Sequence, residues 1–192
     1  MSYKTLFGCM AVVLMLGLAS APDAQPVNSV FGPMRPQGTG AAARPLPPRL
    51  KAFLQASYRD SQATPATEVD IISAPLHTAH GELILVYATG GYVCGTGGCN
   101  LLVLKPTATG YSLIGDVQTW APIRLLPTSH SGRPDIAVWV QGGGVRPGYA
   151  AAMRYDGETY PRDDGVYERH RLGKVSGRIL ISGREKGVRL FP

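Results

Sequence analysis

The sequence lacks an apolar run long enough to cross a membrane. Its longest one, residues 6–18, is shorter than the roughly 20 residues that a bilayer core requires. Lys4 precedes this run and the small residues 19–21 follow it, which is the order of a secretory signal. We therefore predict a signal peptide at residues 1–21, cleaved near residues 19–24, and a periplasmic or secreted mature protein; a retained membrane helix fits the pattern less well.

Cysteine is scarce, with three in 192 residues. Cys9 lies inside the predicted signal peptide and ahead of most of its apolar run, which is the wrong side for a lipoprotein signal, so no lipid anchor is expected. Cys94 and Cys99 remain in a chain bound for an oxidising compartment, and we predict that they form a disulfide. Because the ring is short, it stabilises the fold by only about 2 kcal/mol, and its expected role is to fix the shape of a loop.

Acidic residues are also few, 13 against 19 basic ones. Removal of the signal peptide takes away one basic residue, Lys4, and no acidic one, so the formal net charge falls from +6 to +5. The arginines are scattered and are not interleaved with aromatic residues, which argues against a nucleic-acid partner. The mild positive charge favours an anionic envelope ligand or an envelope protein as partner, with at most a peripheral contact with the membrane.

Bulky side chains are nearly missing from residues 22–48, which are rich in Pro, Gly and Ala. Such a segment buries too little apolar surface to offset its ordering entropy, so we predict a disordered leader. The pattern then changes, because Leu50, Leu54 and Tyr58 recur at helical spacing. They predict one short amphipathic helix over residues 49–59.

The rest of the chain shows short β-type runs separated by Gly and Pro. The runs cover residues 69–72, 82–89, 101–105, 111–117, 123–126, 135–141, 149–155, 158–160, 177–182 and 188–191. Residues 106–110 have the length of a hairpin loop, and Asp156-Gly157 is a dipeptide typical of tight hairpins. We predict a β-dominated α+β fold, in which one short N-terminal helix packs on a meandering antiparallel sheet in a single domain over residues 49–192.

Motifs for catalysis are missing. The glycine-rich residues 141–149 have no Gly-Lys-Ser/Thr ending, so they predict a wide hairpin and not a phosphate-binding loop, with the amides beside Arg146 as an alternative anion site. Ser129, His130 and Asp135 lie close in sequence, but no nucleophile-elbow pattern surrounds the serine. We therefore predict no catalytic residue, no cofactor and no enzymatic activity.

A common zinc-binding spacing is missing too. His77 and His80 precede Cys94 and Cys99, which makes four ligands of a suitable type. Their spacing does not match a zinc ribbon, and an oxidising compartment favours a disulfide over two thiolates. We expect the two histidines on an exposed turn and no metal site.

Glycine, in contrast, is abundant around the two cysteines. Residues 92–100 read Tyr-Val-Cys-Gly-Thr-Gly-Gly-Cys-Asn between two predicted strands. Glycine permits sharp turns and leaves backbone amides uncovered, and a disulfide holds such a loop in one shape. A purely structural turn and a rigid recognition loop both fit this pattern. For the recognition loop, the predicted binding residues are Tyr92, Gly95, Thr96, Gly97, Gly98 and Asn100, with Arg146 and Tyr149 from the second glycine-rich segment.

These motifs resemble those of known exported proteins. Residues 83–88, 92–99, 101–104, 121–128, 138–144, 147–149 and 156–157 resemble a group of uncharacterised exported proteobacterial proteins with a Cys-Gly-x-Gly-Gly-Cys loop and strands like those of FG-GAP repeats. The resemblance covers residues 50–161 and implies no activity. Members often carry an Asp-rich, calcium-like segment before the loop, whereas residues 76–82 here lack those carboxylates, so the resemblance implies no calcium site.

The cysteine loop also resembles that of the Ivy-type periplasmic lysozyme inhibitors, which enters the lysozyme cleft. The inhibitor loop carries a His and an acid where this chain has residues 95–98. We predict an exported binding or interaction module that uses the Cys94–Cys99 loop and residues 142–148. The alternatives are an inhibitor of a cell-wall hydrolase, which needs a polar residue projecting from the loop, and an envelope enzyme, which needs a His and a carboxylate together in a cleft.

Overall fold

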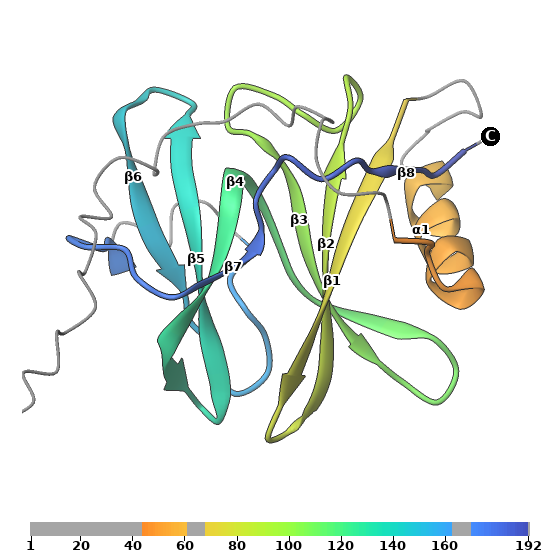
Figure 1. Cartoon of the computed structure of the whole chain (residues 1–192), viewed down its shortest axis with the longest axis horizontal. Coiled ribbons are helices and arrows are strands. Elements are labelled where there is room, and N and C mark those ends of the chain that lie inside the picture. The colour runs from red at the N-terminus through yellow and green to blue at the C-terminus, as the bar shows by residue number, and fades with distance from the viewer. Residues whose placement is uncertain (1–43, 61–67, 163–169, 192) are drawn as a thin grey trace, which may run out of the picture.

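One helix and a large antiparallel sheet make up the computed structural model, which describes residues 44–60, 68–162 and 170–191 (Figure 1). This architecture confirms the predicted β-dominated α+β fold. The predicted signal peptide and most of the predicted leader, residues 1–43, lie outside the described residues. The elements are α1 (Pro48–Asp60), β1 (Asp70–Thr78), β2 (Gly81–Thr89), β3 (Cys99–Pro106), β4 (Tyr111–His130), β5 (Arg133–Gly142), β6 (Val145–Met153), β7 (Arg178–Ile181) and β8 (Val188–Arg189).

The sheet is a meander from β1 to β6, as predicted, with β8 added beside β1, and its strand order is β6-β5-β4-β3-β2-β1-β8. β4 is the strand that joins its two halves, because the first part of β4 pairs with β3 and the second part pairs with β5 and β7. The sequence predicted two strands here, residues 111–117 and 123–126, with Pro122 in the gap between them. One long strand passes through this proline because the register with β5 jumps from Trp120 to Arg124, where a missing N–H breaks no ladder bond.

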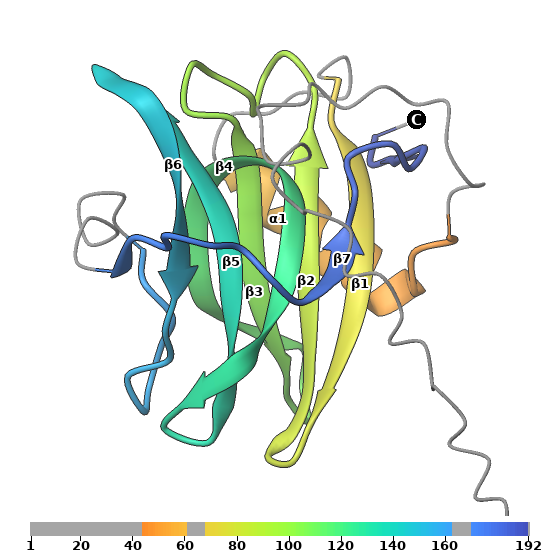
Figure 2. The same cartoon turned by 60° about the vertical axis from the view of Figure 1, so that its left-hand side comes forward.

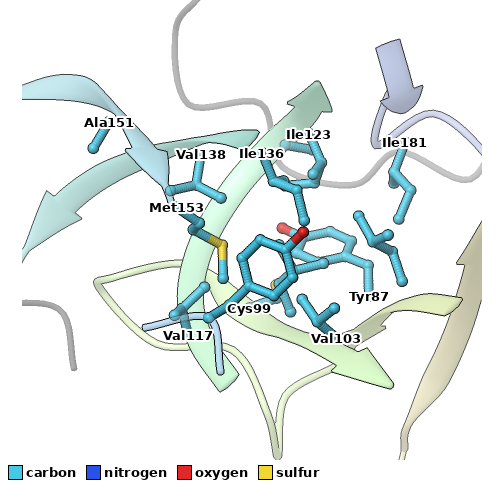
Figure 3. Packing of buried hydrophobic residues seen from close by; sticks show 14 of the residues in the cluster. Tyr87, Cys99, Val103, Val117, Ile123, Ile136, Val138, Ala151, Met153 and Ile181 are labelled. Carbon is cyan, nitrogen blue, oxygen red and sulfur yellow. The ribbon is translucent and has the colours of Figure 1, made fainter. Parts of the chain in front are cut away.

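The main core lies between the two halves of the sheet. Side chains of Tyr87 and Val103 from the first half meet those of Val138 and Met153 from the second (Figure 3). These four side chains are fully buried, with 0 % of their surface exposed. Along β5, every second residue from Ile136 to Val140 lies in this core, which is the two-residue period of a strand with one face turned to the core.

A second core covers the other face of β1, β2 and β3. Leu50 and Leu54 of α1 are buried there, which confirms the predicted apolar stripe (Figure 2). Leu190 and Phe191 complete this core, and the Gln55 side-chain amide donates to the Leu190 carbonyl oxygen at 2.8 Å. Within the described residues, no helix is long and apolar enough to cross a bilayer.

Two boundaries differ from the sequence prediction. Leu46, which belongs to the predicted leader, is buried in the second core, so this core extends to a residue before residue 49. Residues 158–160 form no strand: the Asp156 carboxylate accepts hydrogen bonds from the amides of Glu158 and Thr159, which makes a compact turn. The chain then crosses to β4, where the Tyr160 amide donates to the Ile114 carbonyl oxygen at 2.6 Å.

Candidate functional site: a hollow beside a disulfide-bridged loop

The loop between β2 and β3 is closed by the Cys94–Cys99 disulfide, which confirms the predicted bond. We call residues 94–99 the stapled loop. The amide of Cys94 donates to the Gly90 carbonyl oxygen at 3.0 Å, just before the ring. Inside the ring, the Gly95 and Gly98 backbones exchange two hydrogen bonds of 2.8 and 3.2 Å. Backbone bonds and the disulfide together give the stapled loop a single defined shape.

Gly98 allows the stapled loop to lie in close contact with the sheet. Its φ is +111°, and a Cβ at this position would lie 2.2 Å from the carbonyl carbon and oxygen of Thr119 on β4. Only glycine combines this backbone conformation with so close an approach. Gly90 has the same role at the other side of the loop, since its φ is +126° and a Cβ there would lie 2.0 Å from the Glu68 carbonyl oxygen.

The second glycine-rich segment is a tight hairpin and not the predicted wide one. β5 and β6 pair up to Gly142 and Val145, and only Gly143 and Gly144 make the turn, with φ of +56° and +94°. Gly142 lies directly against the stapled loop: a Cβ there would be 2.3 Å from the Thr96 carbonyl oxygen. The two predicted contact segments therefore meet at one end of the sheet (Figure 1).

Within the stapled loop and its flanks, the predicted binding residues have different environments. The Tyr92 side chain is exposed by 45 %, and Thr96 is exposed as well. Gly97 lies close to Gln118, whereas Gly98 is buried. Asn100 is a partly buried residue of β3 that pairs with its neighbouring strands. Tyr92 and Thr96 are thus the side chains that this segment presents to solvent.

The two predicted binding residues of the second glycine-rich segment differ in their exposure to solvent. Arg146 is exposed on β6. Tyr149 is buried, and the Arg171 guanidinium lies over its ring, 4.2 Å from the centroid. Arg146 is therefore available to a ligand, and Tyr149 supports the strand from inside.

A hollow of about 660 Å³ opens beside the stapled loop. The residues that line it are Asp70, Thr89, Gly90, Gly91, Cys94, Gly95, Thr96, Cys99 and Trp120. Gly95 and Thr96 were predicted from the sequence as binding residues, whereas Asp70 and Trp120 were missed. Asp70 begins β1 and Trp120 lies in the middle of β4, so only the pairing of distant strands brings them to the loop.

Next to this hollow, Arg189 forms ion pairs with two carboxylates. Arg189 of β8 donates from Nε to Oδ1 of Asp70 at 2.9 Å, and its Nη1 lies 3.5 Å from Oε1 of Glu68. Thr89 donates from its hydroxyl to the Asp70 carbonyl oxygen at 3.3 Å. The Asp70 side chain remains 34 % exposed, so its carboxylate is ion-paired and still reachable from solvent.

A histidine and a buried carboxylate meet at the other end of the sheet. Nδ1 of His130 lies 2.8 and 2.9 Å from the two carboxylate oxygens of Asp135, which is 1 % exposed. The hydroxyl that joins them belongs to Thr128, which donates to Oδ2 of Asp135 at 2.6 Å. Ser129 is the neighbour of His130 in an extended strand, so the two side chains point to opposite faces. His130 and Asp135 are therefore paired, and Ser129, which the sequence did not favour as a nucleophile, lies on the other face of the strand.

His77 and His80 belong to the hairpin of β1 and β2, at the end of the sheet away from the stapled loop (Figure 1). Both are exposed, in agreement with the predicted turn. The cysteines are oxidised to a disulfide and are not thiolate ligands. Across the described ranges, no group of three or more His, Cys, Asp or Glu side chains is arranged to hold a metal ion.

Comparison with known proteins adds no relative: no family model, no curated protein and no solved structure matches the chain. The resemblances to the exported protein group and to the lysozyme inhibitors remain predictions. Function must therefore be argued from the geometry of the hollow and its loop.

Proposed function

We propose that the protein is an exported binding module and that the hollow beside the stapled loop receives its ligand. The observation that carries this proposal is the hollow itself, about 660 Å³ in volume and walled by a disulfide-bridged loop. Ligand sites in proteins are typically concave and measure roughly 300 to 1,000 Å³. The hollow also mixes carbon-rich and hydrogen-bonding surface, as such sites do.

The stiffness of the loop supports a role in recognition. A flexible glycine-rich loop loses conformational entropy when a ligand fixes it, and this loss weakens binding. Here the disulfide, the Gly95–Gly98 hydrogen bonds and the contact of Gly98 with β4 hold the loop before any ligand arrives. Binding to such a loop costs little further ordering.

The alternatives find less support in this geometry. Thr96 is exposed and is the polar residue that an inhibitor needs on the loop, but residues 95–98 lack the His and the acid that the loop of the lysozyme inhibitors carries. His130 and Asp135 form the pair that an enzyme requires, but neither lines the hollow. A disulfide is compatible with an extracellular location, and we propose the periplasm or the exterior.

The first prediction tests the loop through the double substitution Cys94→Ser with Cys99→Ser. Loss of so short a ring should lower the free energy of unfolding by only about 2 kcal/mol, so the variant still folds. The affinity for a ligand of the hollow should fall by at least tenfold, because the glycines then have to be ordered on binding. Denaturant unfolding measures the first quantity, and titrations monitored by amide NMR shifts measure the second.

The ligand for this test comes from a fragment library of sugars, short peptides, nucleotides and small anions, screened against the native protein. We expect fragments to shift the amide signals of Gly91, Gly95 and Thr96. Fragments that gather at another surface, or that bind the double variant as tightly as the native protein, would show that the loop has only a structural role.

A further inference from the structure

The walls of the hollow combine hydrogen-bonding groups with a carbon-rich side. Asp70, Thr89 and Thr96 bring a carboxylate and two hydroxyls, and Trp120 and the disulfide bring apolar, polarisable surface. The class of ligand follows from how these groups are charged and exposed. The inference below rests on the proposed function, since it names the ligand class of the same hollow.

Among the described residues that line the hollow, only Asp70 is charged, and its carboxylate is already ion-paired. Arg189 pairs with Asp70 at 2.9 Å and with Glu68 at 3.5 Å. A cationic ligand at the Asp70 carboxylate would lie beside the Arg189 guanidinium, and an anionic ligand would meet the carboxylate itself. A neutral ligand avoids the repulsion between like charges in both cases.

Asp70 nevertheless offers a strong hydrogen-bond acceptor. Arg189 bonds to Oδ1, and within the described part of the chain no hydrogen bond reaches Oδ2. The side chain is 34 % exposed and lines the hollow. A carboxylate oxygen in this position can accept a hydrogen bond from a ligand hydroxyl, and such a charge-assisted bond is stronger than one between neutral groups.

Trp120 supplies the opposite kind of surface. Its Nε1 is buried and has no hydrogen-bond partner among the described residues, so the part of the indole that remains accessible is carbon. An aromatic ring of this kind packs against the C–H groups of a ligand by dispersion and by removing apolar surface from water. Gly91 leaves the approach open, since nothing lies within 4 Å of the place that a Cβ would occupy.

We propose that the hollow binds a neutral saccharide. A pyranose ring presents C–H groups on its faces and hydroxyls around its edge, which matches an indole on one side and a carboxylate with threonine hydroxyls on the other. The volume of about 660 Å³ lies in the range that holds a drug-sized ligand, which is the size of a short oligosaccharide.

The chain carries a built-in reporter for this proposal, because it has only two tryptophans. Trp120 lines the hollow, and Trp139 is its partner across β4 and β5, with its indole N–H bonded to Gln141 Oε1 at 3.0 Å. A nitrogen-15 spectrum therefore shows one indole signal at the hollow and one matched control. The neutral probes are the β-1,4-linked trimers of glucose and of N-acetylglucosamine, which separate plain polysaccharides from amino-sugar glycans.

The expected result is that at least one neutral trimer, at up to millimolar concentration, moves the Trp120 indole signal and leaves that of Trp139 in place. The glucosamine trimer, the galacturonic acid trimer and a blocked alanine tripeptide serve as cationic, anionic and peptide probes. Asp70→Asn should weaken binding of the neutral trimer about tenfold, since a neutral acceptor replaces a charged one. Glu68→Gln removes the other carboxylate beside Arg189 without touching the hollow, and should leave affinity unchanged within twofold.

Three outcomes overturn the saccharide proposal. A charged trimer or the tripeptide moves Trp120 while both neutral trimers do not, in which case the hollow is a binding site for another class and the proposed function stands. No probe moves Trp120, in which case the saccharide is rejected and the fragment screen decides the proposed function separately. Equal losses of affinity in Asp70→Asn and Glu68→Gln would mean that binding responds to the charge around Arg189 and not to the Asp70 acceptor.

Discussion

The stapled loop and the β5–β6 turn are both rich in glycine, but glycine is required for different structural reasons in the two regions. Gly98 of the stapled loop lies against the Thr119 backbone, where a Cβ would be 2.2 Å away. Gly143 and Gly144 of the turn have open space around the Cβ position and are required only for their positive φ. The first glycine permits a close contact between two segments, and the others permit a backbone conformation. Composition alone does not separate these two causes.

Thr119 of β4 contacts both regions. Gly98 rests on the Thr119 carbonyl, which also accepts a hydrogen bond from the Tyr87 hydroxyl at 3.0 Å. The Thr119 hydroxyl donates to the Trp139 carbonyl oxygen at 2.9 Å and accepts from the Trp139 amide at 2.8 Å, which fixes β5 just before its turn. The position of the two glycine-rich regions relative to each other therefore depends on Thr119.

The largest effect is expected from Gly98→Ala. The added methyl group overlaps the Thr119 backbone, and the positive φ is strained for any other residue, so the free energy of unfolding should fall by roughly 4 kcal/mol or more. Thermal unfolding of the purified variant measures this loss. Gly91→Ala is the matched control: nothing lies within 4 Å of its Cβ position, and we expect a change below about 1 kcal/mol. Similar losses in the two variants would refute the contact argument.

Gly142→Ala should have the next largest effect, since its methyl group would lie 2.3 Å from the Thr96 carbonyl oxygen and push the turn away from the stapled loop. We expect a loss of roughly 2 to 4 kcal/mol, and shifted amide signals in the stapled loop. Gly143→Ala, in the same turn but in open space, should cost only about 1 kcal/mol for its positive φ and leave those signals in place. Loop shifts of equal size in both variants would contradict the contact.

Thr119→Val tests the shared support. The substitution keeps the shape of the side chain and removes both hydrogen bonds to the Trp139 backbone, which should cost about 1 to 3 kcal/mol. Amide hydrogen exchange should become faster in the stapled loop and in the β5–β6 turn together. Thr119→Ser keeps the hydroxyl and should preserve the exchange rates; a Val variant that loosens only one region would show that the two are supported separately.

The smallest effect concerns Tyr87, whose pKa is raised by burial to about 12. The unfolded chain loses this phenol proton from about pH 10 upward while the folded chain keeps it, so stability should decline between pH 10 and pH 12. Tyr87→Phe should cost about 1 kcal/mol at neutral pH, through its bond to Thr119, and make the alkaline decline shallower. Unfolding curves from pH 8 to pH 12 test both statements, and an unchanged slope would contradict them.

Local patterns predicted the elements well where the pattern itself determines the structure. The spacing of Leu50, Leu54 and Tyr58 predicted α1, and the β-type run over residues 135–141 predicted the strand that the structure has as β5. The disulfide was predicted from the count of cysteines in a chain that was itself predicted to be exported. These inferences need only residues that are neighbours along the chain.

The sequence predictions that were wrong or incomplete concern residues whose environment is set by contacts with distant parts of the chain. Asp156-Gly157 turns the chain as predicted, but the next strand does not form, because the Tyr160 side chain packs where Gly115 leaves room on β4. Asp70 and Trp120 were missed as parts of the hollow because they reach it from β1 and β4. No local pattern marks residues that become neighbours only when strands pair.

The contact between the first helix and the last residues has a consequence for the order of synthesis. Gln55 bonds to the Leu190 backbone, and Asp70 bonds to Arg189, across separations of 135 and 119 residues. The core beneath α1 is therefore complete only after residues 189–191 have been synthesised and have reached the helix, and such long-range closure is slow. Until then, Leu50 and Leu54 lack part of the apolar surface that covers them in the folded protein.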